Sequence, residues 1–211
     1  ELLTVRALRL IQDADVIVYD RLVPEAIIDL SRRDSEKIYV GKKKSNHSVP
    51  QDEINEVLRN RASNGYNVVR LKGGDPFIFG RGGEETSELY ESAIDFEIVP
   101  GISAALGCAA AAGIPLTHRD YADSVTFLTG HSKEEFSSLN FKRFALSKHT
   151  LVVYMGVGNS KLITNNLIKS GLSRNTPSAI IENGTTDCQR ILFSDLENLD
   201  HLIKSNNIKS P

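Results

Sequence analysis

The chain has few cysteines, little net charge and no long run of large apolar residues. Its two cysteines, Cys108 and Cys188, exclude a disulfide framework and a cysteine zinc site. The formal net charge of −2 does not indicate a nucleic-acid partner. The most apolar stretch, Ile98–Leu116, contains two prolines and three glycines, so we do not expect it to cross a membrane. No signal-peptide pattern is visible, and we expect a reducing, cytoplasmic location.

The common catalytic motifs are also absent. The glycines do not match the dinucleotide-binding fingerprint, and no Walker lysine follows them at the required spacing. There is no His/Glu pair at zinc-binding spacing and no Gly-x-Ser-x-Gly elbow. We therefore expect no metal, and the sequence argues against nucleotide hydrolysis, metal-dependent hydrolysis and serine acyl transfer.

Helical and strand patterns alternate along the chain, which predicts an α/β fold with largely parallel strands. Helices are predicted over Thr4–Ala14, from Ser48 to Gly65, over Ser103–Ala112 and over Asn159–Ser170. Strands are predicted over Val16–Tyr19, Asn67–Leu71, Phe96–Val99, Ser124–Thr129, Thr150–Tyr154 and Ser178–Ile181.

Glycine-rich or charged groups follow each predicted strand. The densest is the run Arg70–Glu85, which has five glycines between Gly73 and Gly83. Glycines leave the backbone bare, so a ligand can approach it closely. Since ligands of parallel sheets bind beyond the carboxyl ends of the strands, these groups predict a binding site there. The bases Arg70, Lys72 and Arg81 either belong to that site or form a solvated face.

Individual site residues remain ambiguous from chemistry alone. Asp20 is either a base or a cap, and Lys42 is a proton donor, an anion contact or solvent-exposed. Asp75 fits either a ligand contact or a plain Asp-Pro turn. Met155, the single methionine, reads first as a core gap-filler. His118–Arg119 either bind an anionic substrate or belong to a polar loop.

Several stretches, in order along nearly the whole chain, carry a family resemblance. They are Asp15–Val23, Tyr39–Lys42, Arg70–Glu85, Val99–Ala104, Gly113–Tyr121, Thr129–His131, Tyr154–Gly156 and Glu182–Thr185. Together they resemble the tetrapyrrole methylase family, and the long Arg70–Glu85 run is similar to its uroporphyrinogen-III C-methyltransferase branch.

The resemblance implies a two-lobed α/β fold, each lobe a sheet flanked by helices, with S-adenosylmethionine in the cleft between lobes. The lobes are expected over residues 1–121 and 122–211. The implied reaction methylates uroporphyrinogen III at C2 and C7 to precorrin-2, for siroheme or cobalamin, with S-adenosylhomocysteine as by-product. Family members are commonly homodimers.

The resemblance also implies roles for individual residues. It makes Asp20 the proton acceptor and Lys42 the donor. The tetrapyrrole carries many carboxylates, so we expect basic side chains to bind it through charge-assisted hydrogen bonds. Those candidates are Arg21, Lys42, Lys43, Arg81, His118 and Arg119. The implied cofactor contacts are Gly73, Gly74, Asp75, Ile78, Ser103, Ala104, Met155 and Gly184.

The chain departs from the family pattern at both ends. The family's first strand, with its Gly-x-Gly-Pro-Gly-Asp-Pro loop, and its last strand are expected to be missing here. This departure motivates an alternative, a silent module that binds tetrapyrrole or cofactor without turnover. A nicotinamide-dependent oxidoreductase has only fold analogy behind it. Relatives that methylate RNA are disfavoured by the balanced charge.

Overall fold

The computed structural model describes residues 2–41, 49–130, 141–145 and 148–210. By its internal contacts the chain divides into two compact units, Glu1–Ser103 and Ala104–Pro211. This division lies before the lobe boundary expected after residue 121, because residues 104–112 pack on strands of the second unit, as described below. The lobe boundary itself stays a prediction.

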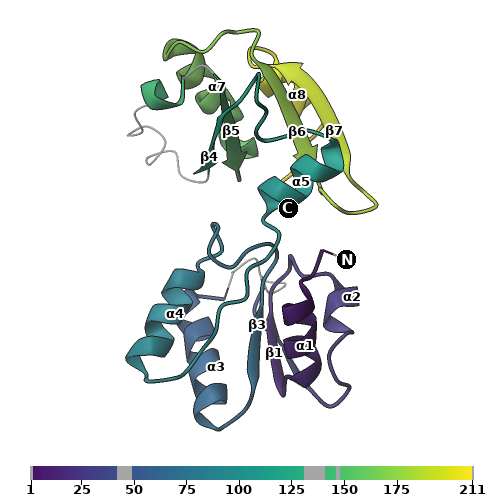
Figure 1. Cartoon of the computed structure of the whole chain (residues 1–211), viewed down its shortest axis with the longest axis vertical. Helices are drawn as coiled ribbons and strands as arrows, with labels where there is room; N and C mark the ends of the chain where they lie inside the picture. The colour runs from purple at the N-terminus through teal and green to yellow at the C-terminus, as the bar shows by residue number, and fades with distance from the viewer. Residues whose placement is uncertain (1, 42–48, 131–140, 146–147, 211) are drawn as a thin grey trace. The chain divides into compact units, whose positions relative to one another are not determined.

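The first unit is a three-stranded parallel sheet with helices on both faces (Figure 1). The strand order is β2-β1-β3, and Val18 of β1 pairs with Ile38 of β2 and Arg70 of β3. The elements are α1 (Val5–Asp13), β1 (Val16–Tyr19), α2 (Glu25–Ile28), β2 (Glu36–Tyr39), α3 (Gln51–Ser63), β3 (Val68–Leu71) and α4 (Gly82–Glu91).

Alternating side chains of β1 build two cores. Ile17 packs in a cluster with Ile11 of α1 and Ile28 of α2. Val16 and Val18 face the other side, where the core includes residues of α3 and α4. All three β1 side chains are at most 1% exposed, so β1 is the centre of the unit. Figure 1 shows α1 and α2 on one face of the sheet and α3 and α4 on the other.

The second unit contains two strand pairs. Strands β4 and β5 are parallel, whereas β6 and β7 form an antiparallel hairpin. Helix α7 and the η1 turn pack on the first pair through Phe141, Phe144, Ile163 and Leu167. The elements are α5 (Ala104–Ala112), β4 (Ser124–Thr129), η1 (Phe141–Phe144), β5 (His149–Tyr154), η2 (Val157–Asn159), α7 (Ser160–Lys169), β6 (Pro177–Glu182), β7 (Arg190–Asp195) and α8 (Leu199–Ser205).

The predicted α/β class is confirmed, with one strand wrong and several elements missed. Strands Val16–Tyr19 and Ser124–Thr129 have the predicted bounds. The predicted strand Phe96–Val99 does not form in the described structure, because no described strand pairs with it and both Phe96 and Ile98 stay exposed. The described helix α3 starts at Gln51 with Pro50 as its N-cap residue, and Ser48 lies outside the described residues. Strands β2 and β7 and helices α2, α4 and α8 were not predicted.

The stretch Ile98–Leu116 contains a single described helix, the nine-residue α5. Among the described residues, no helix has both the length and the apolar character that a membrane crossing requires.

Candidate active site

The carboxyl end of the first unit's sheet gathers several predicted site residues. Its strands are parallel, so the residues that follow Tyr19, Tyr39 and Leu71 emerge at one end of the sheet. A pocket of about 380 Å³ lies there and is lined by Asp20 and Arg21, among others. The rings of Tyr19 and Tyr39, which also line it, are 5.5 Å apart between centroids. The pocket therefore combines aromatic surface with charged groups.

Both carboxylate oxygens of Asp20 have partners. The backbone N–H of Leu22 donates to Oδ1 at 3.0 Å, and Arg70 Nη2 donates to Oδ2 at 3.2 Å. The side chain is 26% exposed. Asp20 thus stabilises a turn and an ion pair while it still reaches the pocket, and its role as proton acceptor stays a prediction.

The Gly73–Asp75 segment is a turn built around the Asp75 carboxylate. Phe77 N–H donates to Oδ1 at 2.9 Å, and Gly101 N–H donates to Oδ2 at 3.0 Å. Asp75 thus makes the contacts of a turn, and its contact with a cofactor stays a prediction. Gly74 has φ +83°, which favours glycine, and a Cβ at Gly101 would collide with the carbonyl oxygen of Gly74. Asp75 holds the loop in shape and leaves the backbone of Gly73 and Gly74 exposed.

The remaining predicted cofactor residues near this segment differ in exposure. Ile78 is half-buried, and its N–H donates to the Asp75 carbonyl at 3.3 Å. Ser103 is buried, and Ala104 is exposed at the first position of α5. Their contacts with a cofactor stay predictions.

Met155 follows β5 directly and is 47% exposed, so the core interpretation of this residue is wrong. Its φ of +54° lies in the left-handed region, which methionine rarely adopts. Strained backbone of this kind concentrates at functional sites. Asn183 and Thr185, on either side of Gly184, also have positive φ, so unusual backbone flanks this second predicted position.

Helix α5 joins these two positions within the second unit. The N–H of Ala105 donates to the Tyr154 hydroxyl at 2.9 Å, next to Met155. One turn further along α5, Cys108 lies so close to Gly184 that a Cβ at Gly184 would collide with its sulfur. The structure therefore brings the start of α5 and the carboxyl ends of β5 and β6 together, and with them three of the predicted cofactor residues: Ala104, Met155 and Gly184.

The predicted substrate-binding bases differ in exposure and in whether they form an ion pair. Arg21 is exposed and lines the pocket beside Asp20. Arg81 is 56% exposed and forms a bidentate pair with Glu84, at 2.9 and 2.7 Å. The hydrogen bond between these two side chains is the main cause of a raised pKa of Arg81 and of a lowered pKa of Glu84. Lys42 and Lys43 lie outside the described residues.

His118 and Arg119 belong to a tight turn that precedes β4. The N–H of His118 donates to the Ala122 carbonyl at 2.7 Å, and the His118 ring lies 4.8 Å from that of Tyr121. The turn is at the amino end of β4, whereas Met155 follows the carboxyl end of the paired strand β5. Six strand residues span about 20 Å, so the second unit alone does not bring these groups together. Their role with substrate stays a prediction.

Sequence reasoning missed a buried ionic cluster behind Asp20. The side chains of Arg70, Lys72 and Glu85 are 13%, 9% and 5% exposed, so the solvated-face interpretation is wrong for the two bases. Burial, and then the nearby Arg70 charge, lowers the pKa of Lys72. The sequence contained one signal for this cluster, the carboxylate of Glu85 within the same run as both bases.

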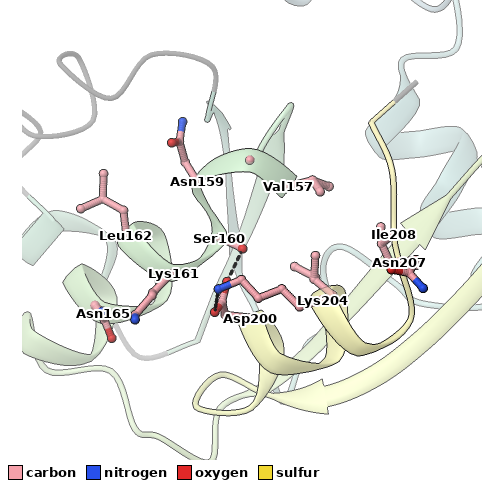
Figure 2. Close-up of a pocket in the computed structure, with 12 residues that line it drawn as sticks. Val157, Asn159, Ser160, Lys161, Leu162, Asn165, Asp200, Lys204, Asn207 and Ile208 are labelled. Atoms are coloured by element: carbon pink, nitrogen blue, oxygen red, sulfur yellow. Dashed lines mark hydrogen bonds and ion pairs between the residues drawn. The ribbon is translucent and has the colours of Figure 1, made fainter.

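A larger pocket of about 810 Å³ lies elsewhere in the second unit, between α7 and α8 (Figure 2). Ser160 Oγ donates to Asp200 Oδ1 at 2.6 Å, and Lys204 Nζ donates to Asp200 Oδ2 at 2.6 Å. Its lining includes none of the predicted site residues that the structure describes. We therefore do not assign it to the candidate active site.

Comparison with known proteins identifies the family. The model of the Tetrapyrrole (Corrin/Porphyrin) Methylases matches residues 1–200. A siroheme synthase from Pseudomonas fluorescens (strain SBW25) is 54% identical over all 211 residues of this chain, which cover 46% of that protein. The chain thus spans about half the length of the curated relatives that it matches.

Solved methyltransferase structures match the chain over nearly its whole length. The uroporphyrin-III C-methyltransferase from Thermus thermophilus, complexed with S-adenyl homocysteine, is 35% identical with a TM-score of 0.78, and covers 100% of this chain and 87% of its own. Cobalt precorrin-4 methyltransferase is 28% identical with a TM-score of 0.86, over 99% of this chain and 86% of its own. The predicted tetrapyrrole methylase fold is confirmed. The chain belongs to the tetrapyrrole (corrin/porphyrin) methylases.

Proposed function

We propose that this chain transfers methyl groups from S-adenosylmethionine to C2 and C7 of uroporphyrinogen III, giving precorrin-2 for siroheme or cobalamin synthesis. The observation that carries the proposal is its 35% identity, over its whole length, to a uroporphyrin-III C-methyltransferase that was crystallised with S-adenyl homocysteine. The siroheme synthases that it resembles support the siroheme branch.

The residues present fit S-adenosylmethionine. In the first unit the exposed backbone of Gly73 and Gly74 offers peptide groups without side chains. In the second unit the exposed Met155 and Ala104 lie where α5 meets β5. When bound, the cofactor supplies an electrophilic methyl group on a sulfonium. The chain's own part is to hold and orient it with the predicted contacts Gly73–Asp75, Ile78, Ser103–Ala104, Met155 and Gly184.

The pocket beside Asp20 is lined by the bases Arg21 and Lys37 as well as by the acids Asp20, Glu25 and Asp29, and we assign part of the macrocycle to its basic side. Arg21 can donate charge-assisted hydrogen bonds to carboxylates, and the rings of Tyr19 and Tyr39 offer apolar surface to a pyrrole. Asp20 faces the same pocket and accepts the proton that the methylated ring must lose. Lys42 is the proposed proton donor. The further proposed contacts of the tetrapyrrole carboxylates are Lys43, Arg81, His118 and Arg119.

The direct test is anaerobic incubation with methyl-labelled S-adenosylmethionine and uroporphyrinogen III. We expect a labelled tetrapyrrole that mass spectrometry shows to carry two added methyl groups. Asp20→Asn should keep the fold and lower turnover. A folded protein that binds the cofactor by calorimetry but makes no methylated tetrapyrrole would refute the enzyme and favour a silent binding module.

The cofactor assignment has its own test in a pair of glycine variants. Gly74→Ala should weaken cofactor binding, because φ +83° disfavours alanine and the new methyl covers exposed backbone. Gly83→Ala is the control, since a Cβ there meets no atom within 4 Å. Equal cofactor affinity of the two variants by calorimetry would remove Gly74 from the site.

A homodimer and a cytoplasmic location complete the proposal, as the family resemblance implies. The two cysteines, Cys108 and Cys188, are both free, which suits a reducing compartment. Light scattering of the purified protein at micromolar concentration tests the dimer, and a monomeric mass would contradict it.

A further inference from the structure

Four charged side chains form a chain of contacts behind the pocket of the first unit. Arg70 Nη2 donates to Asp20 Oδ2 at 3.2 Å, and Arg70 Nε donates to Glu85 Oε1 at 3.2 Å. Lys72 Nζ donates to the same Glu85 oxygen at 2.8 Å. Two positive and two negative groups thus meet, and the cluster is neutral as a whole.

Only the Asp20 end of this cluster reaches the pocket. Asp20 is 26% exposed, whereas the Glu85 side chain is 5% exposed. A carboxylate so deeply buried costs free energy unless charge and hydrogen bonds compensate it. Glu85 Oε1 accepts from three donors, Arg70, Lys72 and Gln51, the last at 3.3 Å. Glu85 is therefore the hub that holds the cluster together.

Arg70 connects Glu85 to Asp20, because its guanidinium group is hydrogen-bonded to both carboxylates. Its Nη1 donates to the carbonyl oxygens of Leu71 at 2.9 Å and of Val18 at 3.4 Å, which lie on neighbouring strands. The guanidinium group is planar, so fixing Nε at Glu85 and Nη1 at the strands also fixes the direction of Nη2. Nη2 is the atom that bonds Asp20. One oxygen of the Asp20 carboxylate is thus linked to Glu85 through Arg70, and the other accepts from the N–H of Leu22 at 3.0 Å.

We propose that Glu85 is a positioning residue that acts through Arg70 to fix the Asp20 carboxylate in the pocket, with Lys72 balancing its charge. Its effect on turnover rests on the proposed function, in which Asp20 accepts a proton. Its effect on the Asp20 carboxylate does not rest on that function.

The kinetic test compares two glutamate variants of the same helix in the full chain. Glu85→Gln keeps the size of the side chain and removes its charge, so Arg70 loses its strong partner. A misplacement of about 1 Å can cost up to about 100-fold in rate, and we expect kcat to fall about 10-fold. KM for the cofactor and the tetrapyrrole should stay within about 2-fold, since the Glu85 side chain is buried and does not line the pocket. Glu88→Gln is the control: Glu88 also lies on α4, and its 3.0 Å ion pair with Arg59 of α3 does not touch the cluster.

A double-mutant cycle separates positioning from a general structural effect. In the Asp20→Asn background the carboxylate that Glu85 positions is gone, so adding Glu85→Gln should lower kcat by less than about 2-fold. The same loss in both backgrounds, or an unchanged kcat in Glu85→Gln alone, would overturn the proposal. Should the unaltered chain make no methylated tetrapyrrole, the proposed function fails, and the next measurement still decides the positioning role.

That measurement is carbon NMR of protein labelled at the aspartate carboxyl carbons. The Asp20 resonance is assigned as the one missing in Asp20→Asn. We expect it to move in Glu85→Gln and to stay in Glu88→Gln, and an unmoved resonance in Glu85→Gln would overturn the proposal. If Glu85→Gln does not fold, the pair Glu85→Leu with Lys72→Met removes one charge of each sign, an exchange that buried ion pairs often tolerate. The same resonance shift is expected in that variant.

Discussion

Alanine in place of Gly184 tests how closely α5 packs on the strands of the second unit. A Cβ there would overlap Cys108 Sγ and would lie 3.3 Å from both Cys108 Cβ and Ile181 Cγ2. The φ of Gly184 is outside the left-handed region, so the cost is steric. Overpacking of this kind costs about 1–3 kcal/mol. For a chain of this size we expect the melting temperature to fall by roughly 2–12 °C.

Removing the sulfur should relieve the overlap. Cys108→Ala alone should lower the unfolding free energy by about 1 kcal/mol, because removing the sulfur of this partly buried side chain leaves a small space unfilled. In the double variant the new methyl group occupies that space, so its unfolding free energy should lie within about 1 kcal/mol of Cys108→Ala. Gly158→Ala is the control in the same unit, where a Cβ meets no atom within 4 Å. Chemical denaturation measures all four variants, and strictly additive losses in the double variant would refute the predicted contact between α5 and Gly184.

Two further predictions concern carboxylates. Asp75→Asn leaves one acceptor oxygen for two N–H donors, those of Phe77 and Gly101, so we expect a loss of about 1–3 kcal/mol in unfolding free energy by chemical denaturation; an unchanged value would contradict the loop model. The pKa of Glu182 is lowered by the N–H of Lys209 and then by Arg190, so its ionised form stabilises the fold above the ordinary pKa of about 4.5, and this contribution is lost as pH falls below it. Glu182→Gln should therefore melt at a lower temperature than the parent chain at pH 7, and the difference should shrink as the pH falls below about 4.5; a difference that is constant with pH would contradict the assignment.

Two strands, Val16–Tyr19 and Ser124–Thr129, have the predicted bounds, and burial explains the first of them. Val16–Tyr19 is a short run of apolar residues at the centre of a parallel sheet, where burial on both faces makes the pattern unambiguous. Strand β2 was missed because its Glu36 and Lys37 are exposed at the border of the sheet. Helix α4 was missed because it opens with two glycines, which weaken any helical pattern. The wrong strand at Phe96–Val99 shows that apolar composition alone does not supply a pairing partner.

The parts of the candidate site that depend on local backbone conformation could be predicted from the sequence. The parts that depend on tertiary contacts could not. Asp-Pro after two glycines indicates a turn, and the Asp75 contacts confirm it. The burial of Arg70 and Lys72 depends on Glu85, which lies on another element and reaches them only after folding. The left-handed backbone of Met155 is likewise fixed by its surroundings, because methionine has no intrinsic preference for it.

The two main-chain contacts of Arg70 have a dynamic consequence for Asp20. Because the guanidinium is bonded to carbonyls of β1 and β3, the carboxylate is anchored to these two strands, of which the central β1 is expected to open least often. The exposed glycines at 73 and 74 have no comparable side-chain anchor of their own. Hydrogen exchange should therefore be slower at the backbone amides of β1 than at those of the Gly73–Gly74 turn, and we expect the turn, rather than the Asp20 carboxylate, to adapt to a ligand.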